Sequence, residues 1–197
     1  MDNRQEPLIH PSTILITLLI AGLSMLFVAL SGAYVYNRLD NAVPPVTVPW
    51  MFYFNTLFLL GSSLTLLRAK KAYNNDEIED YKRYLSYTLA LSMLFLLSQM
   101  IAWYLMNENG MAIDGAQNVS YLYLIPMIHF LHLVGGIPFL IYLLVSARKR
   151  LRQPESALVF FSDPARKRRL FVISTYWHFV DILWVYLIVF FTVNAFI

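Results

Sequence analysis

The residues best suited to chemistry lie near the end of the chain, in "STYWHFVDILWVYLIVFFTV" (residues 174–193). This stretch is apolar enough to span a membrane, yet it contains His178 and Asp181. Because these residues are three positions apart, they share one face of a helix. At 1.5 Å per residue, His178 lies about 13 Å beyond Arg169, near the middle of a bilayer. An ionised carboxylate at that depth costs about 2.5–3.5 kcal/mol by insertion scales, so we expect this face to be covered by protein.

Three roles are open to this pair. A proton relay would use His178 and Asp181 as carriers, but the helix offers no further titratable group toward its far end. A structural pair would hydrogen-bond to neighbouring helices and fix their register. A docking pair would contact a polar residue of another subunit. Trp177 and Trp184 share the face of Asp181 at helical spacing, and such bulky packing favours the structural role.

A second pair of histidines, His129 and His132, occurs in "IHFLHLVGGIP" with the same spacing. A haem held by two histidines needs ligands on opposite faces of the porphyrin, which neighbours on one helix face cannot supply. A zinc site needs at least a third protein ligand, and the sequence indicates none. Gly135 and Gly136 follow the pair and allow helices to approach closely. We therefore expect a crowded helix–helix contact in which the histidines form hydrogen bonds.

Other polar residues within apolar stretches also suit contacts between helices, and we expect Gln99 to be a buried amide with its hydrogen bonds satisfied. The chain has no cysteine, which excludes disulfides, thiolate metal ligands and cysteine nucleophiles. No Gly-rich phosphate loop, H-E-x-x-H pattern or serine elbow occurs. We therefore predict no catalytic residues and no metal site in this chain. The further polar residues are Asn55, Ser62, Ser63 and Thr65 in "NTLFLLGSSLTLL" and Gln99 in "LLSQMIAWYL".

The composition indicates which elements hold these residues. Of 197 residues, 58% are hydrophobic and 14% are charged, and the mean hydropathy is +0.55. Soluble domains are nearer a quarter charged, so this is a polytopic membrane protein. We expect an all-α bundle in a single domain, residues 1–197, preceded by no cleaved signal peptide. Five stretches are long enough to cross the bilayer: residues 14–36, 50–67, 84–106, 121–145 and 170–197.

The basic residues predict the orientation. Residues 68–83 and 148–169 hold 13 of the 15 Lys and Arg, Arg4 would lie on the same side, and Arg38 lies opposite. Short loops rich in Lys and Arg stay in the cytoplasm, so we expect a cytoplasmic N-terminus and a periplasmic C-terminus. The last basic cluster also suits anionic lipid headgroups, although control of topology explains it equally well. The candidate headgroup contacts are Arg166, Lys167, Arg168 and Arg169.

The chain also resembles a known family. "YWHFVDILW" (residues 176–184) is similar to the last-helix motif YWHFVDxxW of subunit III of the haem–copper cytochrome oxidases. "HFLHLVGG" resembles the H-x-x-H-x-x-x-G of the same family, with His129, His132 and Gly136 in the matching places. "NTLFLLGSSLT" and "FLLSQMIAW" resemble the helices before it, in the right order. The resemblance covers essentially the whole chain and indicates the short five-helix bacterial form, which lacks the first two of seven helices.

Two positions depart from the family pattern. The family commonly has Ser-Glu where this chain has Gly22 and Leu23, and often has an acidic residue where this chain has Ala102. Roles of those carboxylates cannot be carried over to this chain.

The resemblance implies an accessory, non-catalytic subunit of a complex that reduces oxygen and pumps protons in the bacterial inner membrane. Haems and copper would lie in partner subunits, while this chain packs against subunit I, contacts other oxidase subunits and binds phospholipid. A larger respiratory supercomplex is a further candidate partner, and nucleic acid is not expected. The equivalent subunit of a quinol oxidase or nitric-oxide reductase is an alternative, as is a free-standing membrane enzyme or transporter that uses the intramembrane histidines. The expected structural polar interior comprises His178, Asp181, His129, His132 and Gln99.

Overall fold

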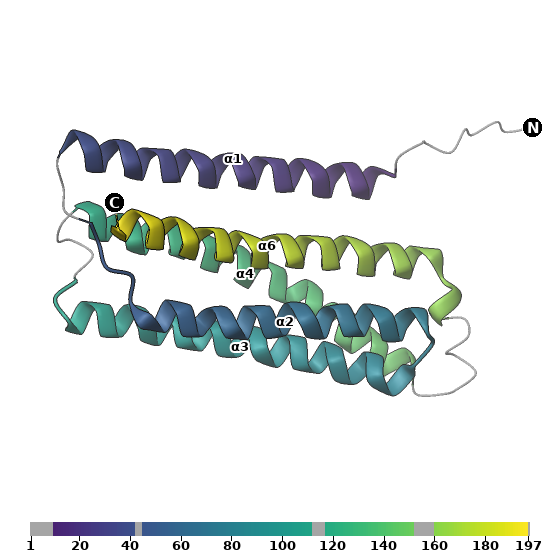
Figure 1. Ribbon diagram of the computed structural model, residues 1–197. Helices are drawn as coiled ribbons and strands as arrows, with labels where there is room; N and C mark the ends of the chain where they lie inside the picture. The colour runs from purple at the N-terminus through teal and green to yellow at the C-terminus, as the bar shows by residue number, and fades with distance from the viewer. Residues whose placement is uncertain (1–9, 42–44, 112–116, 152–159, 197) are drawn as a thin grey trace, which may run out of the picture.

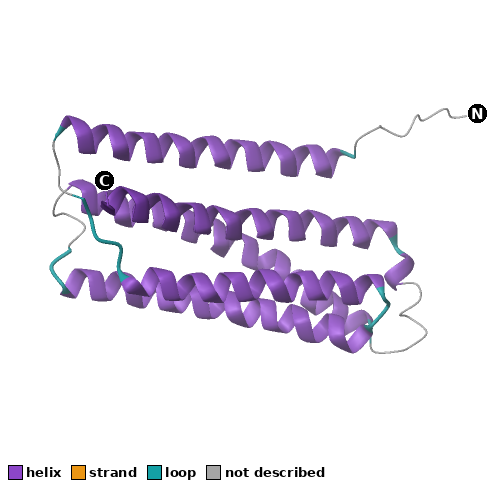
Figure 2. Cartoon of the chain, viewed as in Figure 1, coloured by secondary structure: helices purple, strands orange, loops and turns teal. Residues whose placement is uncertain are grey.

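The computed structural model describes residues 10–41, 45–111, 117–151 and 160–196. The expectations for Arg4 and the rest of residues 1–9, and for Arg152, lie outside these ranges. The described chain contains five helices that are long and apolar enough to cross a membrane, as the sequence predicted (Figures 1 and 2). They are α1 (Pro11–Asp40), α2 (Trp50–Asn74), α3 (Ile78–Glu108), α4 (Gln117–Arg150) and α6 (Pro164–Phe196).

Four helices form a ring. α2 packs against α3, α3 against α4, α4 against α6, and α6 against α2. α1 lies beside this ring and packs against α4 and α6, with its axis running in the same direction as that of α6 (Figure 1). Only 17% of the residues in the most apolar 18-residue stretch of α1 are buried, against 39% in α4 and in α6. α1 is therefore the most peripheral of the five helices.

The helices extend beyond the apolar stretches that predicted them. α2 continues to Asn74 and α3 begins at Ile78, so a turn of three residues joins them. Asp76 in that turn has φ +58°, a left-handed conformation that Asp tolerates better than most residues. Hydropathy marks only the part of a helix that crosses hydrocarbon, whereas backbone hydrogen bonds continue through the charged residues that follow. The expected ends at residues 67, 84 and 170 therefore fell inside the helices.

The start of α6 is fixed by a local cap. Oδ1 of Asp163 accepts a hydrogen bond from the backbone N–H of Ala165 at 2.9 Å, and Pro164 occupies the first helical position. Oδ2 of Asp163 accepts a second bond from Nε of Arg166 at 2.9 Å. The Ala165 N–H, followed by the Arg166 guanidinium, holds the pKa of Asp163 below its usual range. The carboxylate therefore stays charged at the helix N-terminus, where a negative charge is stabilising.

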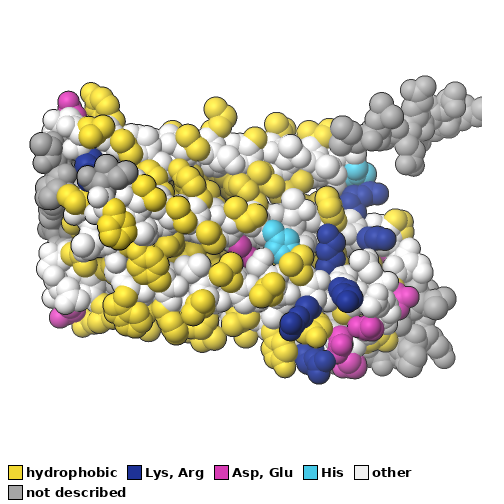
Figure 3. All heavy atoms as spheres, in the orientation of Figure 1, with side chains coloured by type: hydrophobic (Ala, Val, Ile, Leu, Met, Phe, Trp, Pro, Cys, Tyr) yellow, Lys and Arg dark blue, Asp and Glu magenta, His cyan; other side chains and the backbone are white. Residues whose placement is uncertain are grey.

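The core lies inside the ring and is built around aromatic side chains. Trp177 and Trp184 of α6 are completely buried. The Trp184 ring lies 5.0 Å from that of Phe95 on α3 and 5.8 Å from that of Phe52 on α2, centroid to centroid. On the outside, hydrophobic side chains cover the middle of the bundle, and Lys and Arg gather mainly at one end (Figure 3). This distribution matches a bundle that crosses a bilayer.

Candidate functional site

Hydrogen bonds between side chains join α2 to α6 along most of their shared length. Two tryptophan N–H groups of α6 act as donors, and hydroxyl groups supply the other bonds. Such bonds contribute about 0.6 kcal/mol each on average between membrane helices, so their number matters more than any single one. The pairs are Tyr53 with Thr192 at 2.8 Å, Trp184 Nε1 with Thr56 Oγ1 at 3.1 Å, Trp177 Nε1 with Ser62 Oγ at 3.2 Å, and Ser63 with His178 at 2.7 Å.

His178 and Asp181 meet at Ser63 of α2. The Ser63 hydroxyl is hydrogen-bonded to Nδ1 of His178 and also lies beside the Asp181 carboxyl. Asp181 is 3% exposed, and neither of its carboxyl oxygens has a hydrogen bond of ordinary geometry to any described residue. Nε2 of half-buried His178 is likewise unpartnered within the described ranges. The sequence identified Ser63 as a contact residue, but it gave no sign that Ser63 would join this pair.

His129 is held by aromatic rings. It is completely buried, and its ring lies 5.1 Å from that of Trp184 and 6.1 Å from that of Phe95. Neither ring nitrogen has a hydrogen-bond partner among the residues that the structure describes. The sequence analysis expected hydrogen bonding here, and the structure instead gives His129 a packing position at the centre of the ring of helices.

His132 lies where α4 approaches α6. Its Nδ1 is 2.7 Å from the carbonyl oxygen of Ile128 in the preceding turn, and its own carbonyl accepts a hydrogen bond from the Tyr176 hydroxyl at 2.8 Å. A Cβ placed on Gly136 would lie 2.9 Å from the Trp177 ring and 3.0 Å from the Tyr176 ring. Glycine at 136 therefore permits the close approach that the sequence indicated.

Gln99 pairs with Asn55 in the buried interior of the bundle. Both side chains are completely buried, and Nδ2 of Asn55 donates to Oε1 of Gln99 at 2.8 Å. Oδ1 of Asn55 and Nε2 of Gln99 have no partner within the described part of the chain. The expected hydrogen bonding of Gln99 is thus only partly met, and the bond that exists ties α2 to α3.

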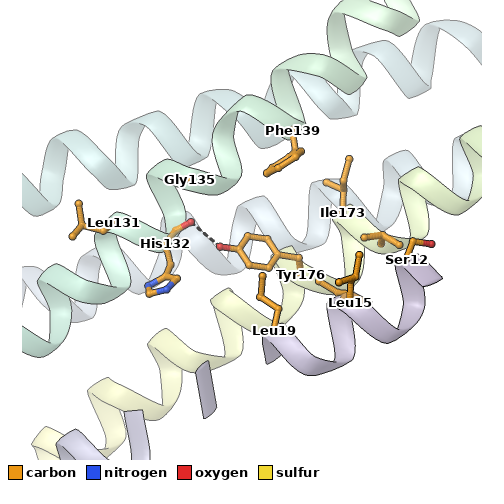
Figure 4. A pocket seen from close by; sticks show the side chains of 11 residues that line it. Ser12, Leu15, Leu19, Leu131, His132, Gly135, Phe139, Ile173 and Tyr176 are labelled. Atoms are coloured by element: carbon orange, nitrogen blue, oxygen red, sulfur yellow. Dashed lines mark hydrogen bonds between the residues drawn. The ribbon is translucent and has the colours of Figure 1, made fainter. Parts of the chain in front are cut away.

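A groove runs between α1, α4 and α6. Its first part is a cavity of about 470 Å³ whose wall includes His132 and Tyr176, with Leu15 and Leu19 of α1 opposite them (Figure 4). Its second part is a cavity of about 430 Å³ that extends to Arg168 and Arg169. The two cavities share Ser12, Phe139, Val172 and Ile173. The groove is therefore continuous from the middle of the bundle to its basic end.

The four candidate headgroup residues do not lie together. Arg168 lines the groove, and Arg169 does so while donating a hydrogen bond to the Tyr142 hydroxyl at 2.5 Å. Arg166 turns away to pair with Asp163, and its guanidinium carbon lies 4.4 Å from the centre of the Phe160 ring. Lys167 is exposed and lines neither cavity. Only two of the four therefore face the groove.

The polar groups of the described helices act mainly as links between helices. Within the described residues, no three His, Asp or Glu side chains lie close enough together to hold a metal ion. What the geometry does offer is a set of interhelical hydrogen bonds, a nearly unpartnered buried carboxyl at Asp181 and an apolar groove with a basic end.

Comparison with known proteins identifies a family whose model matches this chain. The family model described as cytochrome c oxidase subunit III matches residues 38–195, which include α2, α3, α4 and nearly all of α6. A Mycobacterium leprae protein named "Probable cytochrome c oxidase subunit 3" is 32% identical over 142 residues, 72% of this chain and 64% of the relative. The cytochrome c oxidase subunit 3 of Bacillus subtilis is 27% identical over 175 residues, 86% of this chain and 80% of that protein. The match thus spans less than two thirds of the length of the mycobacterial relatives.

Proposed function

The chain belongs to the cytochrome c oxidase subunit III family, and from this premise we propose that it is a non-catalytic subunit of a bacterial terminal oxidase. In this role it packs against the haem-bearing subunit I, stabilises it and binds phospholipid. Haems and copper lie in partner subunits, which pass electrons to oxygen and pump protons. The observation that carries the proposal is the match of residues 38–195 to the family model.

The interior polar residues support a structural role. His178 contacts Ser63 of α2, Gln99 contacts Asn55 of α2, and the backbone carbonyl of His132 contacts Tyr176 of α6. Each of these bonds joins two different helices. A bundle held in register this way offers a rigid surface to a partner, because the interhelical bonds resist sliding of one helix along another.

The proposed topology is a single multi-pass domain in the inner membrane with a cytoplasmic N-terminus and a periplasmic C-terminus. Its support is the positive charge at the end of the bundle where α2 ends and α4 ends and where α3 and α6 begin, since basic loops remain in the cytoplasm. The described basic residues there are Arg68, Lys70, Lys71, Lys82, Arg83, Arg148, Lys149, Arg150, Arg166, Lys167, Arg168 and Arg169.

Phospholipid binding is proposed for the groove between α1, α4 and α6. An acyl chain would lie against Leu15, Leu19 and Phe139, which line the apolar part. The phosphate would lie near Arg168 and Arg169, because guanidinium groups bind phosphate in two-pronged geometry. The groove therefore combines the two chemical halves of a phospholipid in the correct order along the membrane normal.

Purification in mild detergent tests the proposed function. The chain, carrying an affinity tag, is isolated from its native membrane, and the visible spectrum and the masses of associated chains are recorded. We expect haem absorption and a larger haem-bearing subunit in the same complex. Recovery of the chain without any haem protein would overturn the proposal. Activity of the purified complex with quinol or nitric oxide would reassign it to one of those related enzymes.

A further inference from the structure

The C-terminal part of α1 (residues 23–40) is tied to the rest of the bundle by polar contacts. Hydrogen bonds join it to both α4 and α6. Tyr34 is 2% exposed, and its ring lies 5.8 Å from a ring of α4 and 5.6 Å from each of two rings of α6, centroid to centroid. The hydrogen-bonded pairs are Asn37 with Tyr121 at 2.7 Å, Ser31 with Tyr186 at 3.0 Å, and Arg38 with the backbone carbonyl of Asn194.

The N-terminal part of α1 (residues 11–22) has no hydrogen bond to any other described helix. Its Thr17 hydroxyl donates to the Thr13 carbonyl of the same helix at 2.9 Å, and Ile16 is its one buried residue. Apolar contacts therefore hold this part against α4 and α6. Within a bilayer such contacts are readily replaced by lipid tails, because lipid tails are as apolar as leucine. The N-terminal part is thus held much more weakly than the C-terminal part.

Gly22 lies where the two parts of α1 meet. It is exposed, and a Cβ at this position would meet nothing within 4 Å, so packing does not require a glycine here. Glycine weakens the interior of a helix relative to alanine. The Ser24 hydroxyl also donates to the Ile20 carbonyl at 2.8 Å, across Gly22, and bonds of this kind often bend helices. α1 is therefore suited to bend at Gly22.

The weakly held part of α1 is also one wall of the groove. Every α1 residue that lines the groove lies within residues 11–22. Phe139 of α4 and Tyr176 of α6 form other parts of the wall (Figure 4). The width of the groove therefore depends on where the N-terminal part of α1 lies. The α1 residues of the wall are Ser12, Leu15, Ile16 and Leu19.

We propose that residues 11–22 of α1 form a gate that bends at Gly22 and lets a phospholipid pass sideways between the groove and the inner leaflet. This role rests on the proposed function, which assigns phospholipid to the groove, and it specifies how the lipid enters and leaves. The phosphate stays at the basic end near Arg168 and Arg169, while the acyl chains pass between Leu15 and Phe139. The C-terminal part of α1 does not move, because its hydrogen bonds hold it to α4 and α6.

The chain has no cysteine, so pairs of nitroxide labels can be introduced to follow the gate. Leu18→Cys reports on the N-terminal part and Val28→Cys on the C-terminal part, each paired with Leu94→Cys on α3. The two α1 positions are matched, with 64% and 63% exposure, and neither lines the groove. Distances between labels are measured by pulsed electron paramagnetic resonance in the purified complex. The wild-type complex, treated in parallel, gives the background from cysteines of other subunits.

We expect a broad distribution of distances for the pair 18–94 and a narrow one for the pair 28–94. Removal of phospholipid by washing with detergent should shift the first distribution and leave the second unchanged. Narrow, unchanged distributions for both pairs would overturn the gate. Equal shifts in both pairs would also overturn it, because α1 would then move as one rigid helix.

Gly22→Ala tests the position of the bend. The added methyl group enters open space and strengthens the helix, so the 18–94 distribution should become narrower. Exchange of bound phospholipid for chain-deuterated phosphatidylglycerol, supplied in mixed micelles and followed by native mass spectrometry, should slow several-fold. Gly32→Ala is the matched control, because its Cβ also meets nothing within 4 Å but lies in the C-terminal part. Equal exchange rates in the two variants would overturn the gate.

The proposed function and the gate can fail separately. If the chain does not co-purify with a haem-bearing subunit, the proposed function fails before any distance is measured. If the complex forms and carries exchangeable phospholipid, but Gly22→Ala changes neither the exchange rate nor the 18–94 distribution, only the gate is wrong.

Discussion

The hydroxyl of Ser63 on α2 lies 2.7 Å from Nδ1 of His178 on α6, beside the carboxyl of Asp181. This contact joins two helices that are long and apolar enough to cross a membrane, and its residues are 115 positions apart in the sequence. It places three polar side chains at one point on the seam between two helices.

Ser63→Ala should weaken the contact between α2 and α6 without separating the two helices. The variant loses one hydrogen bond, and three others still join α2 to α6, so we expect a loss of about 0.6–1.7 kcal/mol in the free energy of unfolding. The loss is measured as a lower thermal midpoint of the purified complex in detergent. Ser98→Ala is the control, because the one partner of the Ser98 hydroxyl among the described residues is the Phe95 carbonyl of its own helix. Equal midpoints for the two variants would contradict the prediction.

Asp181→Ala should weaken retention of the chain in the complex without altering the haem spectrum. The carboxyl is buried between α2 and α6, so its loss should disturb the packing of these helices, whereas the haems lie in another subunit in the proposed function. The measurement is the ratio of this chain to the haem-bearing subunit after purification in mild detergent. Asp181→Asn is the matched variant, because its amide keeps hydrogen-bonding capacity, and it should restore most of the retention. An unchanged ratio for Asp181→Ala would contradict the prediction.

The five helices could be read from the sequence because each is an apolar run of bilayer length. The contact at Gly136 could also be anticipated, since a glycine beside a crowded segment permits close approach. Pairings between distant residues could not be predicted in the same way. Nothing local to Ser63 indicates that His178 will be its partner, because the packing of α2 against α6 depends on all four helices of the ring.

The candidate lipid contacts show the same limit of prediction from the sequence, here within a run of four residues. The run Arg166–Arg169 looks uniform in sequence, but a helix turns successive side chains by 100°. Arg166 points to Asp163, three residues earlier, and Arg168 and Arg169 point to the groove. The pairing of Arg166 is local and could have been predicted from that spacing. Which remaining residues face the groove depends on where α1 and α4 lie.

Gly136→Ala should destabilise the contact between α4 and α6. The added methyl group would approach the Trp177 ring to 2.9 Å, and both rings beside it are packed between helices. Overpacking of this kind costs about 1–3 kcal/mol, which should appear as a lower thermal midpoint of the purified complex. Gly135→Ala is the control, because a Cβ there meets nothing within 4 Å. A variant at Gly136 as stable as the one at Gly135 would show that the two helices can separate without loss.

Replacing both arginines that face the groove, Arg168→Gln with Arg169→Gln, should reduce the phospholipid that co-purifies with the chain. Glutamine keeps most of the length and polarity of the side chain but removes the charge that binds phosphate. Native mass spectrometry of the complex reports the number of bound phospholipid molecules, and we expect at least one fewer in the double variant.

Lys167→Gln provides the control for this change, because it removes a positive charge from the same run at an exposed position outside the groove. If the lipid is held by the groove, the control should retain its full lipid count. Equal loss in both variants would mean that the basic end attracts anionic lipid through its total charge. Undiminished lipid in the double variant would place the bound phospholipid elsewhere on the bundle, and the apolar cavity beside His132 and Tyr176 would then need a different occupant.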